Sequence, residues 1–322
     1  MRQFVGSAFA LASLPAILTE HEASLGNPSI DSDRSAGSGQ TRPPFVPAIT
    51  LAQWSLHRAI FNGDLDPLDF PSAARSLGVS GVEYVNQFYQ SMPANGKWVT
   101  ELSKRCSAEG IRSHLIMCDG EGDLGDPNSE ERRRSVDRHK RWLDAAKALG
   151  CHSIRVNARS SGTPDEQRKL LVDGLRALCE LAAPLGLSVL VENHGAQSSD
   201  GVWLARVLTE VAHPGMGSLP DFGNFRRSER EWSDRYAGVR ALAPLARAMS
   251  AKSYDFDTDG NETTIDYALM IAIARDANYK GAIGIEYEGR RLSEEQGILA
   301  TKRLLERLLA TSSPDAARML DE

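Results

Sequence analysis

The chain has 322 residues, 41% of them hydrophobic and 25% charged, and its formal net charge is −6. This composition is ordinary for a globular protein, and the length suffices for one large domain or two small ones. The acidic balance argues against a nucleic-acid-binding protein, and no segment approaches the ~20 uninterrupted apolar residues of a membrane-spanning helix.

Residues 1–19 have the pattern of an export signal, because Arg2 precedes an apolar run rich in small residues. The stretch RQFVG resembles the second half of a twin-arginine signal, with the first arginine absent. We therefore expect a periplasmic or exported protein, with a cytoplasmic protein that carries an apolar tail as the alternative. Residues 20–46 are rich in Ser, Gly, Pro and Asp, which is typical of a flexible linker, and residues 313–322 are expected to form a C-terminal tail.

Residues 47–312 repeat one pattern at intervals of about 30 residues. Each unit is a short apolar or β-branched run, a polar loop and an amphipathic helical stretch that often ends at a glycine. One such helix is predicted to begin after Thr163, with Pro164 at its first position, and to end at Gly186. The predicted strands cover residues 48–55, 81–88, 111–118, 153–159, 187–195, 217–225, 247–256 and 281–289.

Eight strands that alternate with eight helices predict a parallel sheet with right-handed crossovers. Eight such units favour a single (β/α)8 TIM barrel of the α/β class, which typically takes about 250 residues. The rival is an open doubly wound sheet, but no G-x-G-x-x-G turn follows the first predicted strand. We therefore expect residues 47–312 to form one barrel.

The four cysteines stand far apart in the sequence and form no C-x-x-C pair. We expect them to be buried free thiols, with a disulfide or a zinc site as the alternatives. They are Cys106, Cys118, Cys151 and Cys179.

In such a barrel the reactive groups come from the C-terminal ends of the strands. Three acids stand out because each directly follows an apolar run: Glu192 in VLVEN, Asp221 in SLPDF and Glu286 in IGIEY. Converging strands should bring them close together, and hard oxygen ligands suit Mg²⁺ or Mn²⁺, with Co²⁺ or Zn²⁺ if a nitrogen ligand joins. The alternative is that each acid pairs with a nearby cation such as Arg155 or Lys252.

The stretches LVENHG, LPDFGNF and GIEYEG follow one another at barrel spacing, with VEYVN and AKSYDF in support. In these stretches residues 47–312 resemble the xylose-isomerase-like TIM barrel family of sugar phosphate isomerases and epimerases. The resemblance implies a divalent metal held by a Glu on strand 5, an Asp on strand 6, a His on strand 7 and a Glu on strand 8. The corresponding residues here are Glu192, Asp221 and Glu286, with Ser250 in the place of the histidine.

The serine departs from the family pattern, because a neutral hydroxyl is a poor replacement for an imidazole ligand. The metal would then be held by three carboxylates and water. Such a site would bind the metal more weakly and would prefer harder ions. His194 or His57 could supply the nitrogen instead. A further alternative is that the metal is lost altogether.

The resemblance implies an isomerase or epimerase of a sugar or sugar derivative. A divalent cation would stabilise an enediolate, while Glu192 and Glu286 as catalytic residues would remove and return a proton. The residues expected to bind substrate are His57, Glu83, Asn157, His194, Asn224, Lys252 and Glu288.

Two alternatives use the same barrel: a keto-sugar lyase or hydrolase, and a non-catalytic sugar-binding barrel that has lost its metal. The expected partner is a small carbohydrate, unphosphorylated or oxidised, because no glycine-rich anion site follows the seventh or eighth strand. The family also suggests a homodimer. Neither nucleic acid nor a membrane is expected as a partner.

Overall fold

The structure, a computed structural model, describes residues 45–92 and 96–311. The predicted export segment 1–19, the predicted linker up to residue 44 and the predicted tail 313–322 lie outside the described residues. At the end of the predicted linker, Phe45 is buried and belongs to the hydrophobic core. Within the described ranges, no helix combines the length and apolar character that crossing a membrane requires.

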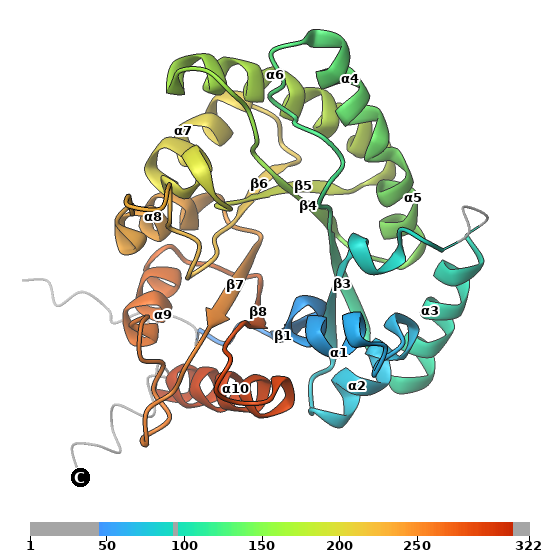
Figure 1. The fold of residues 1–322 in the computed structure, drawn as a ribbon, viewed down its shortest axis with the longest axis vertical. Helices are drawn as coiled ribbons and strands as arrows, with labels where there is room; N and C mark the ends of the chain where they lie inside the picture. Colours follow the sequence, from blue (N-terminus) through green and yellow to red (C-terminus); the bar gives the residue numbers. More distant parts are fainter. Residues whose placement is uncertain (1–44, 93–95, 312–322) are drawn as a thin grey trace, which may run out of the picture. The chain divides into compact units, whose positions relative to one another are not determined.

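Eight short parallel strands form the centre of the fold, and the helices surround them (Figure 1). Every predicted strand contains one observed strand, except that the sixth begins one residue earlier than predicted. The strands are β1 (Ile49–Ala52), β2 (Gly81–Val85), β3 (Arg112–Met117), β4 (Ser153–Asn157), β5 (Ser188–Glu192), β6 (Met216–Leu219), β7 (Ala248–Ser253) and β8 (Ala282–Tyr287).

Hydrogen bonds join the strands in the order β6-β5-β4-β3-β2-β1-β8-β7. The ring closes between β7 and β6 through isolated parallel bridges, one of which joins Asp221 and Ser250. There the Ser250 amide donates to the carbonyl of Pro220 over 2.9 Å, and the amide of Phe222 donates to the Ser250 carbonyl over 3.0 Å. The fold is therefore a closed α/β TIM barrel, as predicted.

The described part of the chain holds ten α-helices, two more than predicted. They are α1 (His57–Asn62), α2 (Phe70–Ser76), α3 (Lys97–Glu109), α4 (Ser129–Arg138), α5 (Lys140–Ala148), α6 (Pro164–Ala182), α7 (Gly201–Val211), α8 (Arg235–Leu242), α9 (Tyr267–Asp276) and α10 (Glu294–Thr311). Short 3₁₀ turns are η1 (Gln53–Leu56), η2 (Pro67–Asp69), η3 (Asn86–Tyr89), η4 (Ala183–Leu185), η5 (Ala196–Ser199) and η6 (Ala243–Leu245).

One of the extra helices arises at His139, which divides residues 129–148 into α4 and α5. The His139 ring Nδ1 lies 2.8 Å from the carbonyl oxygen of Ser135, which the amide of residue 139 would otherwise use in an α-helix. The amide bonds to the Val136 carbonyl instead, over 3.1 Å. A side chain that competes for a backbone acceptor in this way interrupts the helical ladder. The other extra helix is α1, which directly follows η1.

The helix predicted after Thr163 is confirmed as α6. Thr163 caps it, since its hydroxyl accepts from the amide of Glu166 while the Glu166 carboxylate accepts from the Thr163 amide over 2.8 Å. Pro164 occupies the first helical position, where the missing amide hydrogen costs no hydrogen bond.

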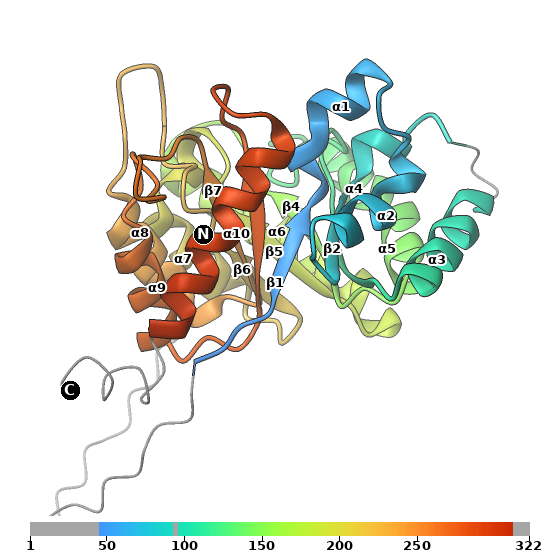
Figure 2. The same cartoon turned by 90° about the horizontal axis from the view of Figure 1, so that it is seen from below.

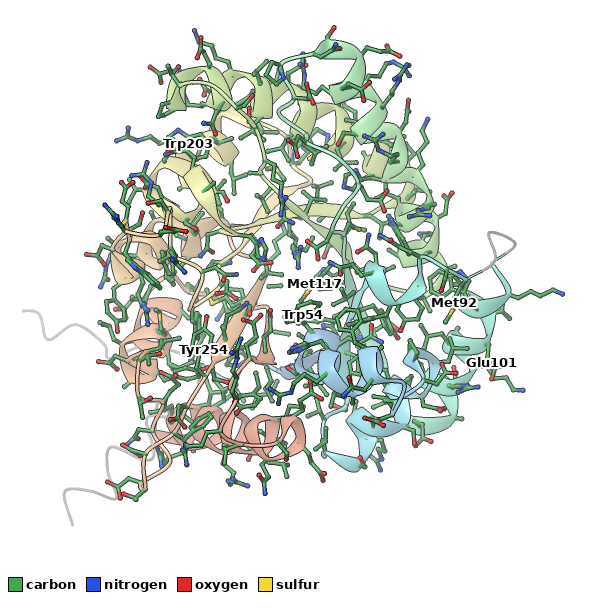
Figure 3. The ribbon with its side chains drawn as sticks, in the orientation of Figure 1. Trp54, Met92, Glu101, Met117, Trp203 and Tyr254 are labelled. Carbon is green, nitrogen blue, oxygen red and sulfur yellow. The ribbon has the colours of Figure 1, made fainter. Side chains whose placement is uncertain are left out.

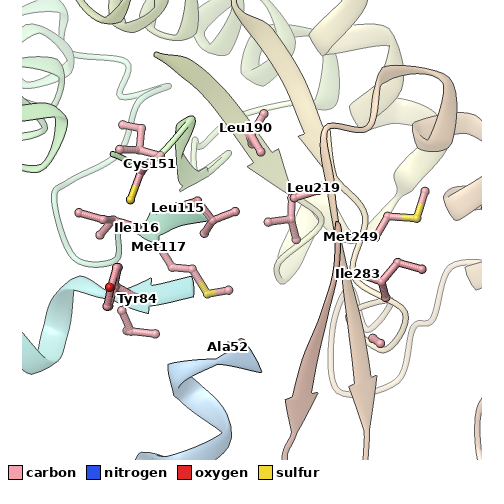
Figure 4. Packing of buried hydrophobic residues seen from close by; sticks show 14 of the residues in the cluster. Ala52, Tyr84, Leu115, Ile116, Met117, Cys151, Leu190, Leu219, Met249 and Ile283 are labelled. Carbon is pink, nitrogen blue, oxygen red and sulfur yellow. The ribbon is translucent and has the colours of Figure 1, made fainter. Parts of the chain in front are cut away.

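The hydrophobic core is built from the buried side chains of the strands and of the helix faces that cover them. Figure 4 shows part of it, including Leu115, Leu190 and Ile283 from three different strands. All four cysteines are buried free thiols, as predicted. Seen from the side in Figure 2, α1 stands at one end of the barrel, which is the end where β1 stops and the loops after the strands begin.

Candidate functional site at the barrel mouth

The three acids singled out in the sequence lie at the C-terminal ends of their strands. Glu192 is the last residue of β5, Glu286 is the last but one of β8, and Asp221 follows β6 by two residues. All three side chains are buried, with exposed fractions of 1%, 4% and 0%. Parallel strands end at the same rim of a barrel, so these carboxylates share one mouth, as the strand pattern predicts.

Lys252 of β7 lies among the carboxylates of the mouth. Its Nζ is 2.9 Å from Glu286 Oε1, 3.0 Å from Glu288 Oε1 and 3.6 Å from Asp221 Oδ2. The side chain is only 2% exposed. Burial by itself lowers the pKa of Lys252, but the surrounding carboxylates outweigh burial and hold that pKa well above its ordinary value. Lys252 is therefore a buried, charged ammonium group.

A second buried cation, Arg155 of β4, faces Glu192. Its Nε is 2.8 Å from Glu192 Oε2, and its Nη1 is 2.8 Å from Asp119 Oδ1. The contact with Glu192 is an ion pair without hydrogen-bond alignment, so that Oε2 keeps an unused lone pair. Burial raises the pKa of Asp119, but Arg155 outweighs burial and brings that pKa down to about 2. Asn157 also donates to Asp119 Oδ1, over 2.6 Å.

Glu192 and Glu286 lie in environments that shift their acidity in opposite directions. Burial raises the pKa of Glu192, and Arg155 only partly offsets it. Burial also raises the pKa of Glu286, but Lys252 and the Ser250 hydroxyl, which donates to Oε2 over 2.8 Å, bring that pKa below its ordinary value. Two neighbouring carboxyl groups whose pKa values are shifted in opposite directions are typical of an acid and a base that work together.

Asp221 and Asn224 organise the turn after β6. Asp221 Oδ1 accepts the backbone amides of Gly223 and Asn224, both over 2.7 Å, which leaves Oδ2 facing Lys252. The Asn224 side chain donates to Glu192 Oε1 over 2.8 Å. The turn therefore links the carboxylate of β5 to that of β6.

Glu83 of β2 was predicted to bind substrate, and it lies one layer deeper in the barrel than Glu286. A Cβ at Gly284, two residues before Glu286 on β8, would come within 2.7 Å of both Glu83 carboxylate oxygens. Thr50 donates to Glu83 Oε1 over 2.5 Å, and the other oxygen has no hydrogen-bond partner. Burial raises the pKa of Glu83 to about 7. Its side chain is fully buried, with an exposed fraction of 0%.

His57 lies apart from the carboxylates, while His194 is near them without joining them. The ring of His57 stacks on Trp54 at 4.8 Å, and its Nδ1 is 2.6 Å from the Trp54 carbonyl. His194 follows β5; its Nδ1 is buried with no hydrogen-bond partner, and burial lowers its pKa.

A pocket of about 640 Å³ opens beside the mouth, lined by Trp54, His57, Arg58, Glu288, Arg290 and Leu292. Glu288 is the residue that connects this pocket to the carboxylates, through its ion pair with Lys252. In Figure 3 Trp54 lies within the ring of strands, whereas Trp203 lies outside it among the helices. The pocket and the mouth are therefore neighbours that share Glu288 through its ion pair with Lys252.

The predicted site residues did not include Arg155 and Asp119, although the structure ties both to Glu192. The sequence carries a signal for them. Arg155 and Asn157 are two residues apart on β4, so both point to the same face of the strand. Asp119 follows the apolar end of β3. Sequence spacing alone does not show that Arg155 pairs with Asp119 and Glu192, which lie on neighbouring segments of the barrel.

The residues do not fit the divalent ion that the family resemblance implies. Lys252 and Arg155 lie against the carboxylate oxygens that would bind it, and Ser250 donates to one oxygen of Glu286. Among residues 45–92 and 96–311, no group of three or more His, Cys, Asp and Glu side chains is arranged to hold a metal ion.

Comparison with known proteins agrees with this architecture. The family model described as "Xylose isomerase-like TIM barrel" matches residues 71–308, most of the chain. No curated protein sequence matches the chain.

Solved structures share the fold at low sequence identity. A 3-keto-D-glucoside 4-epimerase from E. coli has a TM-score of 0.62 at 19% identity, over 75% of this chain and 94% of that one. An L-ribulose 3-epimerase has a TM-score of 0.66 at 12% identity, over 86% and 99%. A xylose isomerase-like TIM barrel protein from Mycobacterium smegmatis, solved in complex with magnesium, has a TM-score of 0.60 at 16% identity, over 83% and 97%. At these identities the likeness concerns the fold.

Proposed function

Because the chain belongs to the xylose isomerase-like TIM barrel family, we propose that it is an isomerase or epimerase of a sugar or sugar derivative. The reaction would proceed by proton transfer at a carbon beside a carbonyl group. The observation that carries this proposal is the pair of buried carboxyl groups at the mouth, Glu192 and Glu286, whose pKa values are shifted in opposite directions. Such a pair can take up a proton at one residue and supply one at the other.

Glu286 is the better base, because Lys252 and Ser250 favour its ionised form. Its carboxylate would take the proton from the substrate carbon, and the electron pair of the broken C–H bond would move to the carbonyl oxygen as an enediolate forms. Glu192, whose burial favours the protonated form, would then return a proton to carbon. Strands β6 and β7 separate β5 from β8 in the barrel, so the two groups approach a substrate from different sides. Return to the opposite face of the same carbon gives epimerisation. Return to the neighbouring carbon gives isomerisation, provided that the hydroxyl proton of the enediol moves to the former carbonyl oxygen.

The pocket beside the mouth supports a substrate of monosaccharide size. Its volume of about 640 Å³ lies within the range of small-molecule sites. The indole of Trp54 and the ring of His57 stacked on it offer apolar faces for sugar C–H groups, and Glu288 offers an acceptor for hydroxyl groups.

Hydrogen exchange is the direct test of this proposal. The protein is incubated in D₂O with a panel of free ketoses, keto-sugars and sugar acids, and loss of the C–H signal beside the carbonyl is followed by NMR. We expect exchange for at least one substrate, and a decrease of roughly 10²- to 10⁴-fold for Glu192→Gln and for Glu286→Gln. Undiminished exchange in both variants would refute the assigned roles.

Glu121→Gln is a matched control, because Glu121 is also a buried glutamate but is held outside the mouth. Its carboxylate accepts from Trp142 Nε1 over 2.7 Å and from Arg141 over 2.9 Å, and glutamine can accept the same bonds at its oxygen. This variant should keep its exchange rate. A product lighter by one molecule of water would support the keto-sugar lyase alternative instead.

A further inference from the structure

The Lys252 ammonium stands where the sugar site needs a cation. Its Nζ contacts Glu286 at 2.9 Å and Glu288 at 3.0 Å, and Asp221 Oδ2 lies 3.6 Å away. These acids come from β8, the loop after it and the turn after β6, so one amine joins three segments of the rim. Two of the three acids, Asp221 and Glu286, are residues that the resemblance assigned to a metal.

The fold holds Lys252 in this place from several directions. In the ladder between β7 and β8, Lys252 lies directly opposite Glu286. The Tyr267 hydroxyl lies 2.9 Å from the carbonyl oxygen of Ala251 and 2.8 Å from that of Lys252. A Cβ at Gly223 would come within 3.0 Å of Lys252 Cδ, so the glycine leaves room for the lysine stem. The position of the ammonium is therefore built into the strand register and the neighbouring turn.

The same strand lacks a nitrogen ligand for a metal. Ser250, two residues before Lys252 and on the same face of β7, donates its hydroxyl hydrogen to Glu286 Oε2 over 2.8 Å. Both oxygens of Glu286 thus face hydrogen-bond donors of β7. A serine at this position supports the carboxylate as an acceptor, whereas a histidine would complete a ligand set.

The oxygens of the other two acids are largely occupied as well. Glu192 has the Asn224 amide at Oε1 and the Arg155 guanidinium at Oε2. Asp221 Oδ1 accepts two backbone amides. Asp221 Oδ2, like Glu192 Oε2, has no hydrogen-bond partner, and its distance of 3.6 Å from the Lys252 ammonium is too long for a hydrogen bond. One N–H of Lys252 is therefore not saturated by the acids around it.

We propose that Lys252, rather than a divalent metal ion, is the resident cation of this site, and that its unsaturated N–H donates to the substrate oxygen on which negative charge develops. The second half of this inference rests on the proposed function; the first half does not. In the proton transfer described above, the ammonium keeps its own proton and stabilises the enediolate oxygen by a charge-assisted hydrogen bond.

Metal binding tests the first half without any substrate. Purified wild-type protein is first analysed for metal content. It is then treated with chelator and titrated with Mn²⁺ and Co²⁺ by calorimetry. We expect no bound equivalent and no binding at micromolar concentrations. A wild-type chain that holds one equivalent of either metal with micromolar affinity overturns the inference.

A double variant, Ser250→His with Lys252→Met, supplies the missing imidazole and removes the ammonium. We expect it to bind Mn²⁺ or Co²⁺ at least about tenfold more tightly than the wild type. Ser250→His alone is the matched control, and it should bind no better than the wild type because the ammonium is still present. A folded double variant that binds no metal overturns the assignment of Lys252 to the position of the ion.

If the double variant folds poorly, the single variant Lys252→Met answers the same question through its melting temperature. That temperature should fall, and added Mn²⁺ should restore part of the loss. A fall without any recovery overturns the inference. Lys302→Met controls for the loss of a lysine as such, because it removes only a salt bridge within α10, from Lys302 Nζ to Glu306 Oε1 over 3.0 Å.

Turnover tests the second half once a substrate is found by hydrogen exchange. Lys252→Met should lower kcat by roughly 10²- to 10³-fold, and wild-type turnover should be unchanged by chelator. Turnover that disappears in chelator and returns with Mn²⁺ overturns the inference. A sugar panel without any exchange counts against the proposed function alone, because the metal titrations do not depend on it.

Discussion

Arg155 offers the sharpest test of how the mouth is stabilised, because one buried guanidinium serves two carboxylates. Its Nε and Nη1 each lie 2.8 Å from a carboxylate oxygen, of Glu192 and Asp119 respectively. We consider the variant Arg155→Met, which keeps an unbranched side chain and removes the charge. Both carboxylates then stay buried without their cation.

The expected cost follows from the acidity of Asp119 and from burial. The pKa of Asp119 falls from an ordinary 3.8 to about 2 although burial opposes the fall, which corresponds to about 2.5 kcal/mol. Because the folded-state pKa is depressed, this stabilisation is fully present above pH ~4 and is lost as the pH falls through about 2. The loss of a cation at Glu192 adds to it, so we expect Arg155→Met to lower the free energy of unfolding by about 3–5 kcal/mol at pH 7.

Arg133→Met is the matched control. Arg133 also pairs with two carboxylates, Glu130 at 2.9 Å and Asp137 at 2.7 Å, but its side chain is 62% exposed. Water solvates those charges when the arginine is removed, so the control should be far less destabilised. Urea unfolding at pH 7, followed by circular dichroism, measures both variants. Equal losses of stability for the two arginines would refute the argument that burial sets the cost.

Three further predictions concern a buried glutamate, a helix glycine and the four cysteines. Burial raises the pKa of Glu83 to about 7, so ionisation of this residue costs the folded wild type stability. Glu83→Gln should therefore become more stable relative to the wild type as the pH rises from about 4.5 to 7, by up to about 3 kcal/mol. A pH-independent difference in urea unfolding would contradict this. Gly174→Ala should be destabilised by about 1–3 kcal/mol despite the better helix propensity of alanine, because its Cβ would lie 1.9 Å from the Leu124 carbonyl oxygen; a melting temperature above that of the wild type would contradict it. The four buried thiols should resist a thiol reagent in native protein and all react in urea, whereas rapid native reaction of any of them would contradict their burial.

The sequence was sufficient for the barrel and for the gathering of acids at its mouth. Strand-helix alternation requires parallel strands, and the C-terminal ends of parallel strands meet at one rim. Glu192, Asp221 and Glu286, each directly after an apolar run, lie buried at that rim. These inferences need only periodicity and chain order, which a single sequence contains.

Only the tertiary structure decided how the charges at the mouth are paired. That Lys252 meets Glu286 depends on the register of β7 against β8, and that its stem has room depends on a glycine in the turn after β6. Whether Arg155 serves Glu192, Asp119 or neither likewise depends on distances of about 3 Å between side chains of different strands. Sequence spacing places residues on a face of a strand, but it does not measure the separation of two side chains across a barrel. For this reason the sequence predicts the acids of the site and names Arg155 and Lys252 as candidate partners, whereas the pairing of each cation with its carboxylates required the tertiary structure.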